Sequence, residues 1–457
     1  MLRRAALLLA LLLPLPHRAA ALPAETRAFV TTTDFSSGGL RRIDLDTRAV
    51  LPGEAPVHTD TRVRWYNGRI YVINRFGQDN IQVVDPATLA TVKQFSTGNG
   101  SNPADIAFAS PTKAYVTLYE RPDLLIVNPQ TGAALGSVAL GSLADADGIP
   151  EMDHMEVAYP WLLVALQRLD RAHGFVPTDS SVIAVVDMRA DTLAGDIRLT
   201  AKNPVTPFVF SSSFGQLLIG CAGAYGALDG GVERIDPIAL KSNGLCVTEA
   251  ALGGDIGAIA WYRNDHCYAV VSDASFNASL VSWSAIDGTK IATVYAPGGF
   301  SIPDIGLDDR DELYVLNSSF TAPGVWVYRA GADVPIAGPL DVGLPPNQIT
   351  FDRVTTDLAS VPPAGVSLGF AAPRPNPARE TVRFDLALAR AGEVEVTVFD
   401  LAGRRVRTLA AGPRSAGAVA LAWDLADAGG ARVAPGLYLV RARVPGAEVT
   451  RRVAVVR

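Results

Sequence analysis

Cysteine is scarce in this sequence, and the cysteine motifs that hold haem or zinc are missing. Only Cys221, Cys246 and Cys267 occur among 457 residues. An odd number leaves at least one thiol unpaired, and neither the C-x-x-C-H of attached haem nor the paired C-x-x-C of a zinc site is present. We therefore expect three small buried side chains in strands in preference to a disulfide. A cytochrome-coupled dehydrogenase is excluded.

Positive charge is also scarce before the last ninety residues. The chain has a net charge of −6, yet residues 366–457 hold 14 Arg, no Lys and 8 acidic residues. The preceding part is therefore strongly acidic, which argues against nucleic acids and anionic membranes as partners. The chain also lacks an H-E-x-x-H zinc motif and a P-loop.

A long hydrophobic run occurs only at the N-terminus. Basic residues at Arg3 and Arg4 precede an apolar stretch over 5–15 and the small residues Ala19–Ala21. This order is typical of a cleaved secretory signal, and the run is too short to span a bilayer. We predict a signal peptide over 1–21, with cleavage after Ala24 as second choice and no transmembrane segment afterwards. The predicted location is the periplasm, the outer surface or the medium.

The body of the chain repeats with a period of 40–50 residues, which indicates a repeat array. Each unit contains apolar strands without a helical pattern between them, and the intervals predict four-stranded propeller blades. The first strand of each unit is predicted at 62–65, 105–108, 156–159, 207–210, 258–261, 304–307 and 348–351.

The first and last repeats complete each other. Residues 28–31 match the second strand of a unit, 40–44 match the third, and the missing first strand is supplied by 347–352. Joining both ends in one blade removes an exposed sheet edge. We predict an all-β chain, with a seven-bladed β-propeller over 25–357. Six blades remain the alternative if one weak unit is an insertion.

The repeat resembles the YVTN-type (quinoprotein amine dehydrogenase-like) propellers. The resemblance rests on Ala114-Tyr-Val-Thr117, Tyr71-Val72, Tyr314-Val315 and turns such as Asn128-Pro129-Gln-Thr-Gly132. It implies the propeller fold and leaves function open, because these residues are strand cores and turns. Relatives include surface-layer-associated proteins and, more distantly, lactonases and quinoprotein dehydrogenases.

The last part of the chain is predicted to be a separate small domain. Residues 358–372 are rich in Pro, Gly and Ala and predict a linker. Short alternating strands over 373–457 predict an Ig-like β-sandwich. Pro375-Asn376-Pro377, the segment 398–404 and Ala434-Pro-Gly-Leu-Tyr438 resemble FlgD-like and type IX secretion sorting-like modules. The resemblance implies sorting or surface attachment, and a purely structural cap is the alternative.

One acidic segment leads into the fourth predicted blade. Residues 145–156 contain five carboxylates and one His. Asp145, Asp147 and Glu151 provide the oxygen ligands that Ca²⁺ prefers, although the spacing is not that of an EF-hand. A calcium site and a solvated acidic loop are both compatible with this pattern. No cofactor is required by the sequence.

The same blade has the longest connection between its second and third strands. In propellers this connection lies on the same face as the one that leads into the first strand, and long loops on rigid scaffolds often carry sites. We therefore predict a ligand site where these loops converge. Its candidate residues are Asp153, His154, Arg168, Asp170, Arg171 and His173, with either His as a potential general base.

These patterns favour a secreted or surface-displayed, non-catalytic binding scaffold whose partner is an unknown extracellular ligand or envelope component. A metal-dependent hydrolase or lactonase at the channel mouth is the first alternative. Some residues at the entry loops of the blades are candidates for such a site, although their recurrence also fits turns: Asn102, Asn203, Asp255, Asp304 and Asn347. A surface-layer structural protein is the second alternative.

Overall fold

The computed structural model describes residues 25–178, 181–211, 214–353, 368–370, 373–388, 392–400, 404–414, 417–444 and 447–456. The predicted signal peptide lies outside them, as does most of the predicted linker. The chain forms two compact units, 1–359 and 360–457, which are described separately. None of the helices in the described ranges combines the length and apolar character needed to cross a membrane.

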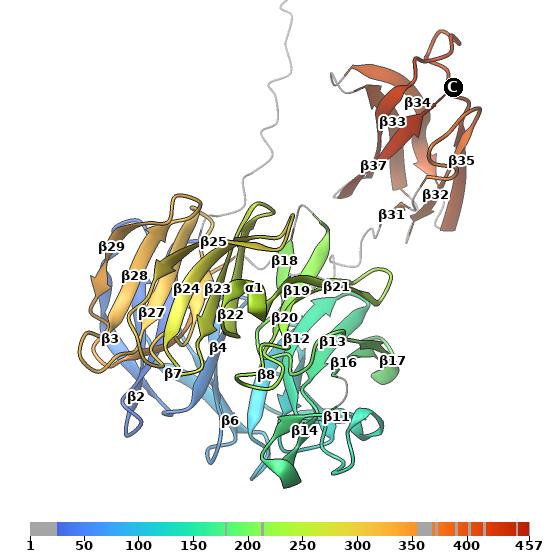
Figure 1. The fold of residues 1–457 in the computed structure, drawn as a ribbon. Coiled ribbons are helices and arrows are strands. Elements are labelled where there is room, and N and C mark those ends of the chain that lie inside the picture. The colour runs from blue at the N-terminus through green and yellow to red at the C-terminus, as the bar shows by residue number, and fades with distance from the viewer. Residues whose placement is uncertain are drawn as a thin grey trace, which may run out of the picture. The chain divides into compact units, whose positions relative to one another are not determined.

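The first unit is a β-propeller whose described residues form seven four-stranded antiparallel sheets (Figure 1). Each sheet begins with an inner strand, and all seven predicted first strands overlap one. The inner strands are β4 (Thr61–Tyr66), β8 (Pro103–Ser110), β12 (Met152–Ala158), β18 (Val209–Ser211), β22 (Asp255–Arg263), β26 (Ile305–Leu307) and β30 (Pro346–Phe351).

The second strands carry the most regular apolar pattern and are almost completely buried. They are β1 (Arg27–Thr33), β5 (Arg69–Asn74), β9 (Lys113–Leu118), β13 (Trp161–Leu166), β19 (Gln216–Cys221), β23 (His266–Ser272) and β27 (Glu312–Asn317). The third strands are β2 (Gly38–Asp44), β6 (Asn80–Val84), β10 (Asp123–Val127), β16 (Val182–Asp187), β20 (Gly231–Asp236), β24 (Ala278–Ser284) and β28 (Gly324–Arg329).

The fourth strands are the most exposed, and two of them are not predicted by the sequence pattern. These two are β3 (Val50–Val57) and β29 (Val334–Leu340), each of which contains two prolines. Proline removes a backbone donor and is tolerated on edge strands, so it interrupts the pattern without ending the strand. The others are β7 (Thr91–Ser96), β11 (Ala134–Ala139), β17 (Thr192–Arg198), β21 (Lys241–Thr248) and β25 (Thr289–Tyr295).

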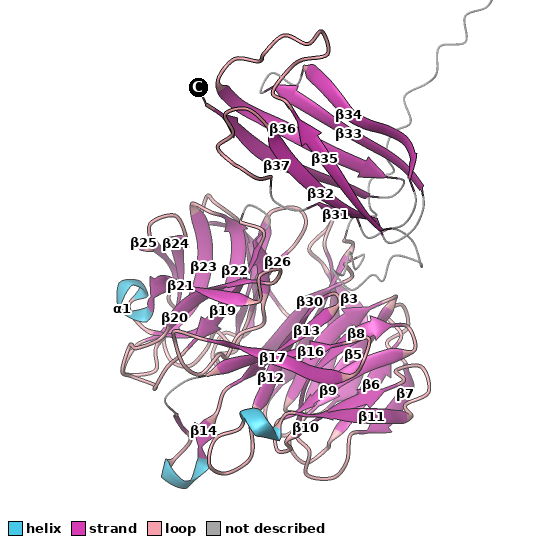
Figure 2. Cartoon of the chain, turned by 90° about the vertical axis from the view of Figure 1, so that its right-hand side faces the viewer, coloured by secondary structure: helices cyan, strands magenta, loops and turns pink. Residues whose placement is uncertain are grey.

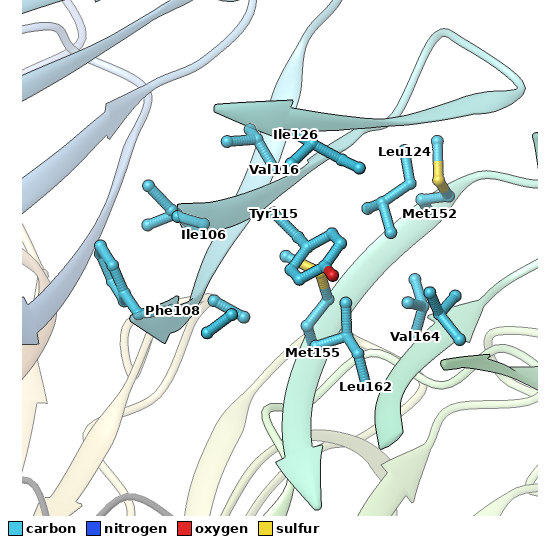
Figure 3. Packing of buried hydrophobic residues seen from close by; sticks show 14 of the residues in the cluster. Ile106, Phe108, Tyr115, Val116, Leu124, Ile126, Met152, Met155, Leu162 and Val164 are labelled. Carbon is cyan, nitrogen blue, oxygen red and sulfur yellow. The ribbon is translucent and has the colours of Figure 1, made fainter. Parts of the chain in front are cut away.

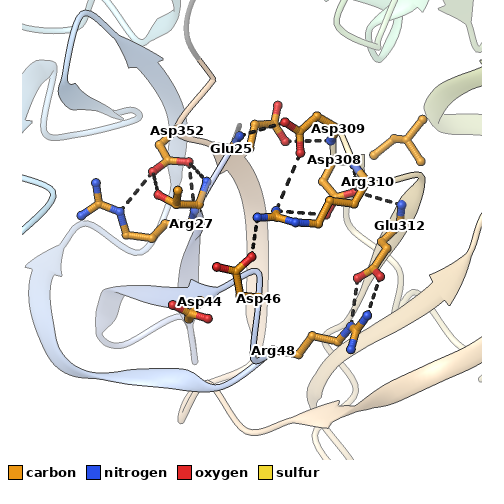
Figure 4. Close-up of polar contacts among 12 residues, drawn as sticks. Glu25, Arg27, Asp44, Asp46, Arg48, Asp308, Asp309, Arg310, Glu312 and Asp352 are labelled. Carbon is orange, nitrogen blue, oxygen red and sulfur yellow. Dashed lines mark hydrogen bonds and ion pairs between the residues drawn. The ribbon is translucent and has the colours of Figure 1, made fainter. Parts of the chain in front are cut away.

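Both ends of the propeller meet in one blade, as the sequence predicts. The sheet order is β3-β2-β1-β30, with Ala28 opposite Phe351. Asp352 accepts hydrogen bonds from the Thr26 amide at 2.7 Å, the Arg27 amide at 2.9 Å and the Arg27 Nε at 3.1 Å (Figure 4). This carboxylate therefore ties the two ends of the propeller together.

The core lies between neighbouring blades. Figure 3 shows Ile106 and Tyr115 of one blade packed in one cluster with Leu162 of the next blade. The rings of Tyr66 and Phe108 stack with centroids 4.0 Å apart. Alternate strand residues face neighbouring sheets, so most of the apolar side chains in the repeat are used for inter-blade packing.

Two tyrosines at matching positions of the second strands, Tyr115 and Tyr268, link blades through hydrogen bonds. Tyr115 donates to Asp191 at 2.5 Å, and Tyr268 donates to Asp333 at 2.7 Å. Both acceptors lie in the turn before the fourth strand of the next blade. These tyrosines are therefore architectural.

The three cysteines are free, and Cys221 and Cys267 are buried. The Cys246 thiol donates to the Val232 carbonyl at 3.2 Å, and Cys267 donates to the Arg263 carbonyl at 3.0 Å. All three lie in strands without a disulfide, as predicted, but Cys246 is only partly buried.

The second unit is a β-sandwich with an Ig-like fold, and strands connected by loops make up its described residues (Figure 2). Trp423 is fully buried and packs edge-on against Tyr438, with ring centroids 5.3 Å apart. One sheet comprises β31 (Leu368–Phe370), β32 (Val382–Leu388) and β35 (Gly417–Trp423). The other comprises β33 (Gly392–Asp400), β34 (Arg405–Arg414), β36 (Gly436–Val444) and β37 (Ala447–Val455).

Candidate functional site

A cluster of charged side chains connects the inner strands β4, β8 and β12. Arg62 pairs with Asp153, so it joins the first and third of three consecutive blades. Arg64 binds Asp105 through two parallel hydrogen bonds of 2.7 and 2.6 Å. Inner strands line the central channel of a propeller, and we call this set, with His154, the channel cluster.

The channel cluster is closely interconnected. Arg64 Nη2 lies 3.5 Å from His154 Nδ1, and His154 lies 3.7 Å from Asp105 and 3.9 Å from Asp153. Asp105 also accepts from the Ile106 and Met155 amides at 2.8 and 2.9 Å. Paired carboxylates with this many donors are held firmly in one position.

The cluster's environment shifts the pKa values of its acidic groups. Burial alone would raise the pKa of Asp105, but the charge and hydrogen bonds of Arg64, aided by His154, hold that pKa well below its ordinary value. Burial likewise opposes ionisation of Asp153, and Arg62 outweighs it and lowers the pKa of Asp153. Both carboxylates are therefore ionised at neutral pH.

The imidazole of His154 is shifted toward its neutral form. Burial lowers the pKa of His154, and the positive charge of Arg62 adds to this effect against the opposing influence of Asp153 and Asp105. A neutral imidazole beside Arg64 can act as a hydrogen-bond acceptor. Its position among ion pairs fits a role in packing the cluster.

Gln167 extends the channel cluster into the connection that follows β13, in the same blade as β12. Gln167 donates to Asp153 at 3.0 Å and accepts from Tyr119 at 2.6 Å. Gln167 also donates to the Pro204 carbonyl at 3.3 Å. The Gln167 side chain therefore links the channel cluster to the connection after β9, which holds Tyr119, and to the connection before β18, which holds Pro204.

The predicted site residues separate into distinct groups in the structure. Asp153 and His154 belong to β12, which begins at Met152, and both are buried. The segment 145–156 is therefore not wholly a solvated loop. Polar side chains are tolerated there because the inner strand faces the channel cluster.

Arg171 belongs to a second group. Its Nε donates to Glu151 at 2.7 Å and lies 3.4 Å from Asp147, and its guanidinium also pairs with Glu120. Burial raises the pKa of Glu151 to about 7, opposed by the Leu169 amide and Arg171. The guanidinium thus lies between two predicted calcium ligands and already provides positive charge there.

The third predicted ligand is in a turn of its own. Asp145 accepts from the Asp147 amide at 3.2 Å, and Asp147 accepts from the Ile149 amide at 2.8 Å. In the described part of the chain, no group of three or more His, Cys, Asp or Glu side chains could hold a metal ion. Calcium binding by Asp145, Asp147 and Glu151 stays a prediction.

Asp170 and His173 form a local pair at the loop tip. Asp170 caps a short 3-10 helix, η2 (Arg171–His173), and its carboxylate lies 2.6 Å from His173 Nδ1. Hydrogen bonding to His173 lowers the pKa of Asp170. His173 is exposed. The Arg168 amide donates a hydrogen bond to the Pro150 carbonyl, and the Arg168 carbonyl accepts one from the Thr178 amide. The structure therefore pairs Asp170 with His173 at the loop tip and does not bring them into the channel cluster with Asp153 and His154.

Six buried side-chain oxygens have no hydrogen-bond partner among the described residues. Three of them belong to Asn102 and Asn203, which precede β8 and β18, and to Asp255, the first residue of β22. Asp304 also precedes an inner strand, and burial raises its pKa to about 7 despite donation from the Ile349 and Ile305 amides.

Sequence reasoning missed the partners that define the channel cluster. Arg64 occupies a position of the first strand at which the other units have Ala, Val, Gly or Thr, whereas the position of Arg62 is polar in most units. An arginine at an otherwise apolar or small strand position is a usable signal, because buried charges require partners. Asp105 occupies the place of Arg62 in the next unit.

Comparisons with known proteins support the two folds. Residues 378–447 match the family model for the FlgD Ig-like domain. A putative 6-phosphogluconolactonase from Bacteroides fragilis is 14% identical, with a TM-score of 0.51, over 72% of this chain and 98% of that one. At this identity the likeness shows the fold alone.

Two further solved structures have lower TM-scores. PorZ, a surface component of the type-IX secretion system of Porphyromonas gingivalis, is 14% identical with a TM-score of 0.42, over 93% of this chain and 64% of that one. The β-propeller domain of Cps50 (Swd1) from Myceliophteria thermophila is 11% identical with a TM-score of 0.48, over 68% and 99%. A search of curated proteins found no match.

Proposed function

We propose that this protein is an exported, non-catalytic recognition scaffold. The observation that carries the proposal is that the ionisable groups of the channel cluster are committed to one another. Arg64 and Arg62 hold Asp105 and Asp153 in their ionised forms. General acid–base catalysis requires a group whose pKa lies near the working pH. The lowered pKa values of Asp105, Asp153 and His154 favour a structural role for these three residues, whereas burial raises the pKa of Asp304, outside the cluster as defined, to about 7.

The proposal assigns separate roles to the two units. The first is a YVTN-type propeller that binds an extracellular ligand or envelope component through its loops. The second is a sorting or attachment module, a role supported by the match of residues 378–447 to the FlgD Ig-like domain. The leader-like pattern over 1–21 supports export to the periplasm, outer surface or medium.

Fractionation of the producing cells tests the attachment role. We expect the full chain to be exported and retained at the envelope, whereas a chain stopped at Ser360 is exported and released. A chain without residues 2–21 is the control and should stay in the cytoplasm. Equal retention of the full and shortened chains would show that the second unit does not attach the protein.

A metal-dependent hydrolase or lactonase is the second candidate, favoured by the three unpaired oxygens of Asn102, Asn203 and Asp255. Carboxylate and amide oxygens are calcium ligands. Thermal unfolding with and without Ca²⁺ separates the candidates. A rise in melting temperature that Asp255→Asn abolishes would favour the metal-dependent candidate, and no rise is expected for the scaffold.

A further inference from the structure

Exposed aromatic side chains gather on one face of the propeller. In an antiparallel blade, the connection between strands two and three lies on the same face as the connection that leads to the next blade. We call this face the loop face. Four adjacent blades and one connection between them each present an exposed ring there. The five residues, here named the aromatic arc, are Phe35, Tyr225, Phe276, Phe300 and Phe320, and each is 68–80% exposed except Phe276 at 61%.

The blades that carry the arc are neighbours. Their inner strands contact one another in the order β18, β22, β26 and β30. The rings of Phe35 and Phe320, from the first and last blades along the chain, have centroids 6.4 Å apart. On the opposite face, Tyr159 is the exposed aromatic found in the connections of the described residues. The arc is therefore a property of the loop face.

Local structure presents these rings to solvent at a conformational cost. Phe35 and Phe276 have φ angles of 66° and 60°, in the left-handed region that bulky residues avoid. Asp34 accepts from the Ser36 and Ser37 amides, and Asp273 accepts from the Ser275 and Asn277 amides, so both turns are held in place. Neither ring contributes to the core, which indicates that its exposure serves another purpose.

The connections that carry and border the arc contain acidic residues and no basic ones. These connections, 34–37, 222–230, 249–254, 273–277, 296–304, 318–323 and 341–345, contain no Lys and no Arg. Asp34, Asp229, Asp273 and Asp341 lie in them, and their carboxylates accept hydrogen bonds from backbone amides. The other half of the loop face differs, because it carries arginines such as Arg75 and Arg171, paired with Asp60 and Glu120.

We propose that the aromatic arc is a docking surface for an arginine- or lysine-rich polypeptide segment. A cation above an aromatic ring is attracted to the face of that ring, and nearby carboxylates add charge complementarity. Aromatic side chains are also enriched among the residues that dominate interface energies. The same charges would repel anionic glycans and nucleic acids. The inference rests on the proposed recognition role and specifies its partner class.

Binding of a defined cationic peptide to the full chain tests the inference. The probe is a labelled peptide in which arginine alternates with leucine and serine, and the comparison peptide has glutamine in place of arginine. Fluorescence anisotropy should show binding of the arginine peptide that weakens with salt, because surface charges are screened. The combined variant Phe35→Ser, Phe276→Asn and Phe320→Ser should weaken binding by about tenfold or more.

Two control variants separate the arc from the rest of the surface. Phe76→Ser removes an exposed ring from the loop face outside the arc, and Ile238→Ser removes an exposed apolar side chain on the opposite face. Both should leave affinity within about twofold, as is typical of substitutions outside an interface hot spot. The combined variant Asp34→Asn, Asp229→Asn and Asp273→Asn should bind more weakly and with a smaller salt dependence.

Three results would overturn the inference. They are no binding of the arginine peptide, equal binding of both peptides, and equal affinity of the arc variant and wild type. Binding of neutral glycan or envelope material that the arc variant retains would overturn the arc and leave the recognition role intact. Turnover of a lactone that requires Asp255 would instead overturn the proposed function.

Discussion

Replacing Arg64 by methionine is expected to lower the free energy of unfolding by about 3–5 kcal/mol, because removing one partner leaves a buried charge uncompensated. Arg64 provides two of the four hydrogen bonds that Asp105 accepts. Methionine keeps most of the side-chain volume and removes the charge. Urea unfolding of the full chain, followed by tryptophan fluorescence, measures the loss.

The pH dependence of this variant provides a second readout. In the wild type the pKa of Asp105 is lowered, so the stability that it contributes is present above its ordinary pKa and is lost as the pH falls below it. Without Arg64, burial dominates and the pKa of Asp105 rises. The variant should therefore recover part of the lost stability on mild acidification, whereas the wild type should not gain.

Arg69→Met is the matched control for Arg64→Met. Arg69 is 45% exposed and pairs at 3.1 Å with Asp85, which directly follows β6 in the same blade. Exposed pairs contribute about 0–1 kcal/mol. Equal, small effects of Arg64→Met and Arg69→Met would contradict the structural role of the channel cluster.

Substitution of Asp352 by alanine is expected to cost about 3 kcal/mol or more, because several donors lose a buried acceptor. The donors are two backbone amides, the Thr26 hydroxyl and the Arg27 side chain, all at the other end of the propeller. Their loss weakens the blade that closes the propeller, so unfolding should begin there. In the Asp352→Ala variant, amide hydrogen exchange in β1 and β30 should be faster than in the wild type, and the increase should be larger than in β9.

Asp46→Ala provides the control in the same region. Asp46 pairs with Arg310 at 2.8 Å, but its side chain is 73% exposed (Figure 4). Its removal should change stability by less than about 1 kcal/mol. If Asp352→Ala unfolds like wild type and exchange in β1 and β30 is unchanged, strand pairing alone closes the propeller.

The fold is predictable from this sequence because its signal repeats. The second strands, such as β9 and β27, are buried on both faces, so the apolar pattern recurs wherever a blade does. The prolines of β3 and β29 hide those strands because the pattern depends on continuous apolar residues. Their places follow only from the number of strands that each blade needs.

The functional surfaces are less predictable, because they depend on residues from different repeats. Asp153 and His154 are visible as unusual polar residues, but their partner Arg62 lies 91 residues from Asp153. Phe35 and Phe320 are even farther apart in the chain, and neither residue on its own differs from an ordinary residue in a connection between strands. Only closure of the propeller brings such residues together.

The protonation state of His154 tests the account most directly. Its neighbours within the cluster are Asp105, Asp153, Arg62 and Arg64, and its pKa is lowered by burial and by Arg62. Nitrogen NMR of histidine-labelled full chain, with the His154 signal assigned by its loss in His154→Gln, follows the ring. The account predicts that His154 titrates below the ordinary histidine pKa, so that the imidazole is neutral at about pH 7 to 8. A titration centred near pH 7 would instead reveal an available proton acceptor in the channel and contradict a purely structural cluster.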